Sequence, residues 1–303
     1  MKMKKKMNRN VVSDHIQAYT FIGPAIIILS IFVYISIFVA IYMSFNQVNL
    51  FKWTFDFNGL DNYRRIFTED RIFKAFSNTA KFVAVVAPTQ TVLALILAAV
   101  LNSKIRGQKA FRLVYFLPTL TSSTALTMIF MFIFSISGPF NTIGMALGFV
   151  KEATNWLNEP KVTLKIIMIM NIWSTIPYYM TIYLSALQDV PMSLYEAAEV
   201  DGASPFKRFI NITVPHMKPI TSFVFITGII GTFQMFDQAY IFSNGAGGPQ
   251  NSTLTVALMV YQYAFSLLND MGLASAVAII LAVVIIIASL VANKLNKSEK
   301  LYS

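Results

Sequence analysis

Long apolar runs alternate with short polar segments along the whole chain. Six of these runs reach the roughly 20 apolar residues that a helix needs to cross about 30 Å of hydrocarbon. They lie near residues 20–45, 76–101, 113–134, 163–187, 219–242 and 271–292. The pattern predicts an all-α polytopic membrane protein with six transmembrane helices. A shorter run at 254–268 is interrupted by Tyr261, Gln262 and Tyr263, and it predicts a partly inserted or surface helix.

The composition agrees with a chain that needs lipid as its solvent. Hydrophobic residues make up 56% of the 303 residues and charged residues 13%. There is no cysteine, which excludes disulfides, thiolate metal sites and a cysteine nucleophile. The two histidines, His15 and His216, are far apart in sequence and show no metal-ligand spacing. We therefore expect neither a metal site nor a cofactor in this chain.

The net charge of +10 is a topology signal because of how it is distributed. Fifteen Lys and Arg residues fall on the face that holds both termini and seven on the other face. Cytoplasmic loops retain positive charge, so we expect cytoplasmic segments at 1–19 and 293–303 around a transmembrane domain at 20–292. The first apolar run is too long for a signal peptide and lacks a small-residue cleavage site. No aromatic-interleaved basic patch supports nucleic-acid binding, whereas attraction to anionic lipid is expected.

The predicted cytoplasmic loop at 189–219 begins with a short helix. Pro191 discourages continuation of the preceding membrane helix, and Ser193 with Glu196 forms a capping-box pattern. Gly202 is a typical stop for this helix. The residues that share its expected apolar face are Leu194, Ala197 and Ala198.

A second short helix is expected directly afterwards. Ser204 is a good N-cap, Pro205 suits the first helical position, and Pro215 is expected to limit the far end. The apolar residues at helical spacing are Phe206, Phe209 and Ile210. Lipid, the protein's own helices or a partner protein would each be able to cover these two apolar stripes.

The residue order in this loop resembles the EAA loop of ABC importer permeases. The matching residues are Glu196, Ala197, Ala198, Asp201, Gly202, Ala203, Phe206, Ile210, Val214, Pro215 and Pro219. The family usually has Leu-Pro where this chain has Val214-Pro215. In that family the loop is a coupling helix that docks in a cleft of the nucleotide-binding subunit. The resemblance therefore implies an ATPase-coupling role for Glu196, Ala197, Ala198, Gly202 and Phe206.

The resemblance covers most of the chain and is to the sugar-importer permeases related to the maltose and glycerol-phosphate systems. Residues 20–45 look like their first core helix, 172–188 like the fourth, and 233–255 like the outer end of the fifth. The family often has a proline where Ile35-Ser36 stands. The resemblance implies a permease of the bacterial cytoplasmic membrane that imports a sugar or oligosaccharide by alternating access. Its implied partners are a second homologous permease, cytoplasmic ATP-binding subunits and an extracytoplasmic solute-binding protein.

Motifs for nucleotide binding and for catalysis are missing from the sequence. Without a G-x-x-x-x-G-K-[ST] pattern, ATP and Mg²⁺ are expected on the partner ATPase. Without G-x-S-x-G, H-E-x-x-H or P-C-x-x-C, an enzyme is not expected. An ion-coupled secondary transporter would normally carry ionisable groups inside its helices, and Asp237 is the only acidic candidate. A scaffold subunit, or a permease for another polar solute such as a glycerol phosphodiester, stays open.

Polar groups at membrane depth mark a candidate substrate pathway. Asn171 lies about 12 Å inside the outer end of its helix and Gln234 about as deep in the next, so we expect both to face one cavity. The other candidates are the hydroxyl of Ser122, in the run 119–124, and the rings of Trp173, Tyr178, Phe233 and Phe236. Amides and hydroxyls suit an uncharged polyhydroxylated ligand, because buried charges are costly. Such side chains also commonly hold neighbouring membrane helices together.

Overall fold

The computed structural model describes residues 7–49, 53–103, 107–266 and 269–295. Within these residues the chain is almost wholly helical, with one antiparallel hairpin of two strands, β1 and β2. The longer helices are α1 (Met7–Leu29), α2 (Ser36–Ser44), α4 (Asp70–Asn102), α5 (Gln108–Leu120), α6 (Ser123–Ile133), α8 (Thr163–Leu187), α9 (Met192–Val200), α12 (Lys218–Phe233), α14 (Val256–Phe265) and α15 (Met271–Leu295). The expectation of an all-helical membrane fold is thereby met at the level of secondary structure.

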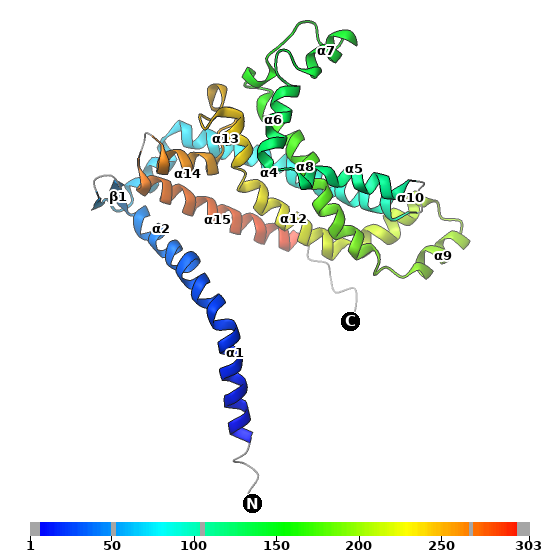
Figure 1. The fold of residues 1–303 in the computed structure, drawn as a ribbon, viewed down its shortest axis with the longest axis horizontal. Coiled ribbons are helices and arrows are strands. Elements are labelled where there is room, and N and C mark those ends of the chain that lie inside the picture. The colour runs from blue at the N-terminus through cyan, green and yellow to red at the C-terminus, as the bar shows by residue number, and fades with distance from the viewer. Residues whose placement is uncertain (1–6, 50–52, 104–106, 267–268, 296–303) are drawn as a thin grey trace, which may run out of the picture.

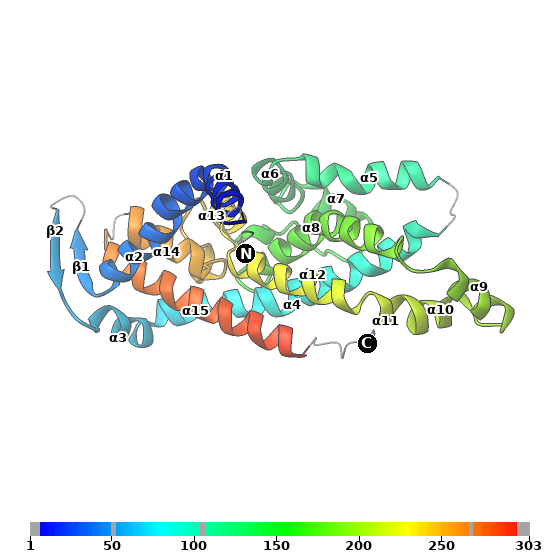
Figure 2. The same ribbon diagram turned by 90° about the horizontal axis from the view of Figure 1, so that it is seen from below.

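Shorter elements connect these helices. They are β1 (Asn46–Asn49), β2 (Thr54–Phe57), α3 (Asp61–Thr68), α7 (Pro139–Ala146), α10 (Pro205–Arg208), α11 (Val214–His216) and α13 (Asp237–Ser243), with π-helical turns at Ser30–Ile35 and Phe209–Thr213 and 3₁₀ turns at Trp156–Asn158 and Pro249–Asn251. In both views of the ribbon, the hairpin and α9 lie at opposite ends of the long axis (Figures 1 and 2).

Four helical segments among the described residues are long and apolar enough to cross a membrane. They are Gln17–Ser44, Asp70–Asn102, Lys218–Ser243 and Met271–Leu295. A fifth is formed if Leu113–Leu120 and Ser123–Ile133 count together, although they meet at an angle of 107°. The helix α8 occupies the fourth predicted span and is 25 residues long, but its sequence is more polar and it is not among the four. The predicted count of six is therefore not reproduced by length and composition.

The third predicted span is broken because its polar run starts a new helix. Thr121 has extended backbone angles, and the Ser122 hydroxyl accepts a hydrogen bond from the Ala125 backbone N–H at 3.2 Å. Ser122 is thus the N-cap of α6. The run 119–124, whose hydroxyls were predicted to line a substrate pathway, therefore also contains the N-cap residue that begins α6.

The first apolar helical segment leaves the rest of the molecule beyond α2, which contacts α15. Residues 17–43 include no buried residue, Ser44 at the end of α2 is buried, and Figure 1 shows α1 projecting from the end that holds β1. The π-helical turn Ser30–Ile35 lies in its middle. Its apolar surface must therefore be covered by lipid or by another protein.

Two apolar cores follow each other along the long axis. One joins the starts of α4 and α8 to α14 and α15, with Ile72, Phe82, Ile167 and Leu273 fully buried. The other joins the ends of α4 and α8 to the start of α12 around Tyr183. The side chains of Thr175 and Gln90 join α8 to α4 by a 2.8 Å hydrogen bond. These contacts fix α4, α8 and α12 relative to one another, and α12 carries part of the candidate site.

The run at 254–268 is not a surface helix. Its helical part, α14, buries Val256, Leu258, Met259, Gln262, Tyr263 and Ala264 against neighbouring helices. Its interrupting polar residues are held by specific bonds: the Tyr263 hydroxyl donates to Glu69 at 2.8 Å, and Arg71 donates to the Gln262 amide oxygen at 2.5 Å. Sequence pattern alone did not show these partners, which lie almost 200 residues away in the chain.

Candidate functional site

A polar pocket lies where α12 ends and α13 begins. Phe236 leaves helical geometry there, with φ −126° and ψ −59°, and the freed carbonyl of Met235 accepts a 2.9 Å hydrogen bond from the buried Thr255 hydroxyl. The pocket has a volume of about 200 Å³. It is lined by Asn171, Gly231, Gln234, Met235, Phe236, Asp237 and Gln238. The break in the helix therefore exposes polar groups to a cavity in an otherwise apolar span.

The side chain of Asn171 is buried at the edge of this pocket, and its Oδ1 atom has no hydrogen-bond partner within the described residues. A buried acceptor without a donor costs about 1 to 3 kcal/mol. A ligand hydroxyl in the pocket would be able to supply the missing donor. Asn171 and Gln234 thus line one cavity, as their predicted depths suggested, while their role in transport stays a prediction.

A second cavity of about 330 Å³ adjoins the first through Gln238, which lines both. Its wall carries hydroxyls from α6, α8 and the preceding break. These and the other lining residues are Pro118, Thr119, Thr121, Ser123, Leu126, Met170, Ser174, Thr175, Tyr178 and Tyr179. Gln238 also donates to the Ser123 hydroxyl at 3.3 Å. The two cavities together present amides, hydroxyls, the Asp237 carboxylate and the rings of two predicted pathway residues, Phe236 and the exposed Tyr178.

The remaining predicted pathway residues lie elsewhere. Phe233 is buried in the apolar core. Trp173 packs against Phe130 of α6, with the two ring centroids 5.8 Å apart. Ser122 is exposed and acts as the N-cap of α6. None of these three lines either cavity, so the structure does not bring them together with Asn171 and Gln234.

Sequence reasoning missed two residues of the first cavity, Asp237 and Gln238. Gln238 lies four residues after Gln234, but the helix breaks between them, so no helical spacing in the sequence indicated that both amides line one cavity. Asp237 is exposed and is the only charged residue of the cavity wall. In the part of the chain that the structure describes, no group of three His, Asp or Glu side chains is placed to hold a metal ion.

The loop helices α9 and α10 lie at the far end of the molecule from the hairpin (Figures 1 and 2). The prediction that Gly202 ends the first loop helix is confirmed, and its backbone has φ +75°. The Gly202 N–H donates to the Glu199 carbonyl at 3.0 Å, and the Ala203 N–H donates to the Ala198 carbonyl at 2.8 Å. This is the Schellman arrangement, in which left-handed geometry favours glycine. Ser204 caps α10 through its hydroxyl, which accepts from Lys207 N–H at 3.4 Å.

Two other expectations for this loop are wrong. The helix α9 begins at Met192 with Pro191 as its N-cap, so Ser193 lies inside the first turn and forms no capping box. Pro215 does not end the second helix, which continues through α11. A proline lacks an N–H and crowds the preceding turn, and the wider π-helical turn Phe209–Thr213 lies directly before it. That wider turn accommodates the proline without a break.

The two loop helices are joined to each other and expose their outer side chains. Arg208 Nη1 contacts Glu199 Oε2 at 2.6 Å, and the hydroxyls of Tyr195 and Thr213 lie 2.9 Å apart. Tyr195 and Phe209 face the second apolar core, whereas the predicted apolar stripe residues Leu194 and Ile210 are exposed. The most exposed apolar side chains are Met192, Val200 and Phe206. Of the predicted coupling residues, Ala198 is half-buried, and Glu196, Ala197, Gly202 and Phe206 are exposed.

Comparison with known proteins assigns this chain to a protein family. Residues 90–300 match the family described as "Binding-protein-dependent transport system inner membrane component". The lactose transport system permease protein LacF of Rhizobium radiobacter is 34% identical over 90% of this chain and 92% of its own. The multiple sugar-binding transport system permease protein MsmF of Streptococcus mutans is 33% identical over 92% and 94%.

The fold has a counterpart among solved structures. A chain in the crystal structure of a bacterial alginate ABC transporter, in complex with a pentasaccharide-bound periplasmic protein, superposes with a TM-score of 0.81. The two share 20% sequence identity over 95% of this chain and 96% of that one. At this level of identity the superposition shows a common fold and nothing about function. A family match over two thirds of the chain, together with several apolar helices, makes this a multi-pass membrane protein. The chain belongs to the binding-protein-dependent transport system inner membrane components, the permease subunits of ABC transporters.

Proposed function

We propose that this chain is the membrane-spanning subunit of an ATP-driven importer for a sugar or oligosaccharide. The observation that carries the proposal is the polar cavity at the break between α12 and α13, with the unpartnered Oδ1 atom of Asn171 at its edge. The adjoining cavity adds the hydroxyls of Ser123, Ser174 and Thr175. Such groups suit a ligand with many hydroxyls, and relatives such as LacF are named as sugar transport permeases.

The charge of the cavity wall favours an uncharged sugar over a glycerol phosphodiester. The lining residues of both cavities include the carboxylate of Asp237 and no Lys or Arg. An anionic ligand would meet repulsion there and no compensating cation. An ion-coupled mechanism has one acidic candidate in the cavity wall, Asp237, and its side chain is exposed and not buried among helices as a coupling carboxylate would be.

ATP hydrolysis by the partner subunits would be coupled to the substrate pathway through the loop at 189–219. As a permease the chain is not an enzyme, and we assign ATP and Mg²⁺ to cytoplasmic partner subunits. The exposed apolar side chains of α9 and α10 form a surface of the kind that docks against another protein. Closure of the ATPase dimer would move these helices, and α11 would transmit the movement to α12 and the cavity. Alternating access would follow from that movement.

In the proposed topology this chain crosses the membrane six times, with both termini in the cytoplasm. Residues 1–19 and 293–303 would flank the transmembrane domain at 20–292. The unburied apolar surface of α1 and α2 supports a second homologous permease as a neighbour, alongside lipid. An extracytoplasmic solute-binding protein would deliver the sugar at the hairpin end.

The direct test is uptake of a panel of radiolabelled sugars by the reconstituted transporter, together with Asn171→Leu and Gln234→Leu variants. Losing a hydrogen bond to the sugar inside the membrane should slow uptake roughly five- to tenfold. Affinity of the solute-binding protein and assembly of the complex should not change. The control is Asn293→Leu, an exposed amide at the end of α15. Unchanged uptake in both pathway variants would assign these amides to helix packing or to no role.

A further inference from the structure

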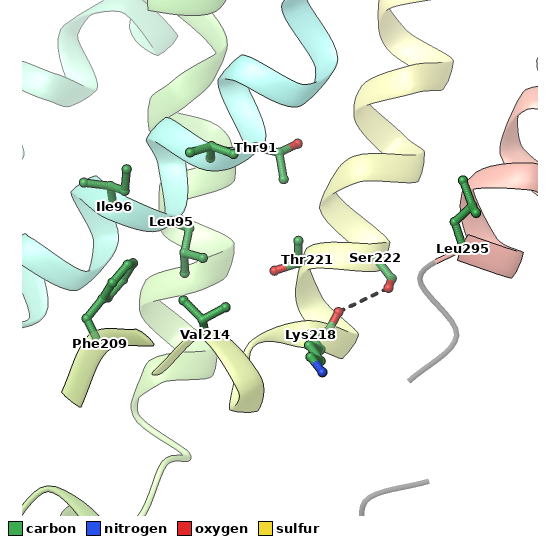
Figure 3. A pocket seen from close by; sticks show the side chains of 10 residues that line it. Thr91, Leu95, Ile96, Phe209, Val214, Lys218, Thr221, Ser222 and Leu295 are labelled. Atoms are coloured by element: carbon green, nitrogen blue, oxygen red, sulfur yellow. Dashed lines mark hydrogen bonds between the residues drawn. The ribbon is translucent and has the colours of Figure 1, made fainter. Parts of the chain in front are cut away.

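A groove separate from the two cavities opens between α4, the start of α12 and the end of α15 (Figure 3). Its volume is about 420 Å³, within the range of sites that hold small molecules. It is lined by Thr91, Val92, Leu95, Ile96, Phe209, Val214, Lys218, Thr221, Ser222 and Leu295. None of these residues lines the cavities around Asn171 and Gln238, so the groove is not a continuation of the candidate pathway.

The hydroxyl groups of the groove are already engaged by the protein itself. Thr91 donates to the Ala87 carbonyl at 2.7 Å, and the Tyr183 hydroxyl donates to Thr221 at 3.1 Å. Ser222 donates to the Lys218 carbonyl at 3.2 Å, as Figure 3 shows. What the groove offers a ligand is therefore an apolar wall and the ammonium group of Lys218.

Lys218 has no counter-charge in the part of the chain that the structure describes. The four ion pairs among these residues involve Arg64, Arg65 and Arg208 with acidic partners, and Lys218 is in none of them. Its side chain is exposed at the first residue of α12. An apolar groove that ends at one unpaired cation matches a molecule with a hydrocarbon chain and an anionic head.

We propose that this groove binds an anionic glycerophospholipid. One acyl chain lies along Val92, Leu95 and Ile96, and the headgroup phosphate contacts the Lys218 ammonium. The proposal rests on the proposed function for its orientation, which puts Lys218 at the cytoplasmic headgroup level. Basic pockets between membrane helices on that side are typical sites for anionic headgroups. The net charge of +10 adds to the attraction of such lipids.

A fluorescent reporter in the groove tests the proposal. The complete transporter, carrying Ile96→Trp, is reconstituted into phosphatidylcholine vesicles in which one lipid, either phosphatidylglycerol or phosphatidylcholine, carries brominated acyl chains. Quenching of the added tryptophan, relative to the three native ones, reports which lipid occupies the groove. The position control is Ile287→Trp, which replaces an exposed residue of α15 outside the groove.

Brominated phosphatidylglycerol should quench the Ile96→Trp reporter more strongly than brominated phosphatidylcholine, while Ile287→Trp shows no preference. Adding Lys218→Gln should reduce that preference roughly fivefold, and the charge control Lys207→Gln should leave it in place. Equal quenching by both lipids at Ile96→Trp, or a preference that survives Lys218→Gln, would overturn the proposal. Quenching by neither lipid would overturn it as well, since protein would then cover the groove, from a second permease or from residues 296–303.

A second measurement covers the case in which Ile96→Trp does not assemble. Native mass spectrometry of the otherwise unaltered transporter, washed in detergent and then mixed with phosphatidylglycerol, should retain this lipid, and the Lys218→Gln variant should retain less. Equal retention would contradict the proposal. Both measurements are made without ATP or sugar, so their outcome is independent of whether the uptake assay supports the proposed function.

Discussion

Two segments between long helices contain the same turn-forming residue types, glycine and proline, but differ in how exposed they are. They are residues 189–219 and 244–255. The first contains one glycine with positive φ and the second contains three, and each has a proline at a helix start. In the first segment Gly202 has open space around it, and Phe206 is 73% exposed. In the second, a Cβ added to Gly248 would lie 2.5 Å from the Thr253 hydroxyl, and Leu254 is fully buried. Local turn chemistry is thus shared, and the surroundings decide what each segment does.

The difference arises from side chains distant in sequence. The buried Asn78 of α4 donates to the carbonyls of Asn251 at 2.8 Å and Leu254 at 3.0 Å, and Thr79 accepts from Val256 N–H at 3.0 Å. These bonds satisfy the backbone of the segment at 244–255 and hold it against the core. The loop helices lack such anchors on their outer face. The segment at 244–255 is therefore fixed against the core, whereas the segment at 189–219 exposes apolar side chains that a partner protein would be able to contact.

The largest effect on stability is expected from Asn78→Ala. Two buried carbonyls would lose their donor, which should lower the free energy of unfolding by roughly 2 to 4 kcal/mol. The measurement is the apparent unfolding temperature of the purified complex in detergent. Asn211→Ala, an exposed amide within the segment 189–219, is the matched control and should have no effect. Equal shifts in the two variants would remove the contrast between the segments.

Gly202→Asp should abolish coupling with a smaller effect on stability. A side chain at φ +75° strains the backbone by about 1 to 2 kcal/mol, and the new charge sits where the ATPase would dock. Pull-down of the ATPase and substrate-stimulated ATP hydrolysis should both fall roughly tenfold or more, with normal permease levels in the membrane.

Gly59→Asp is the control for this variant. Gly59 has φ +61° and equally open surroundings, but it lies just beyond the hairpin at the opposite end. Its substitution should leave ATPase binding intact. Full stimulation of ATP hydrolysis in Gly202→Asp would mean that the coupling role belongs to another segment.

The smallest effect concerns the ion pair between Glu199 and Arg208. Exposed pairs contribute about 0.2 to 1 kcal/mol, so Arg208→Glu should weaken stimulated ATP hydrolysis by only about two- to fivefold. The swapped variant, Glu199→Arg with Arg208→Glu, should recover most of the loss if the pair sets the angle between α9 and α10. Failure of the swap to recover activity would indicate that Arg208 contacts the ATPase directly.

The parts of this molecule that were predictable from sequence are those set by local chemistry. The apolar runs located the helices, and Gly202, Ser204 and Pro205 marked the turn between the loop helices. The break at Thr121 was missed because the same hydroxyls suit both a cap and a pathway. The burial of α14 was missed because its polar residues are satisfied by Glu69 and Arg71, partners that no local pattern reveals.

The candidate site was predictable in part for the same reason. Helical rise alone placed Asn171 and Gln234 at similar depth, and they do line one cavity. Phe233 and Trp173 are aromatic and lie next to cavity residues in the sequence. In the structure, however, Phe233 is buried in the apolar core and Trp173 packs against Phe130 of α6. Depth follows from residue counting, whereas the direction of a side chain depends on tertiary packing.

Docking of the exposed loop helices on the ATPase is the central claim, and cross-linking tests it most directly. The chain contains no cysteine, so Phe206→Cys gives it a single thiol at an exposed position of α10. Reaction of the assembled transporter with a short thiol-specific photo-cross-linker should join this residue to the ATP-binding subunit. Phe57→Cys, equally exposed in the hairpin, should give no such product. Absence of the ATPase adduct from Phe206→Cys, or equal adducts from both variants, would contradict the account.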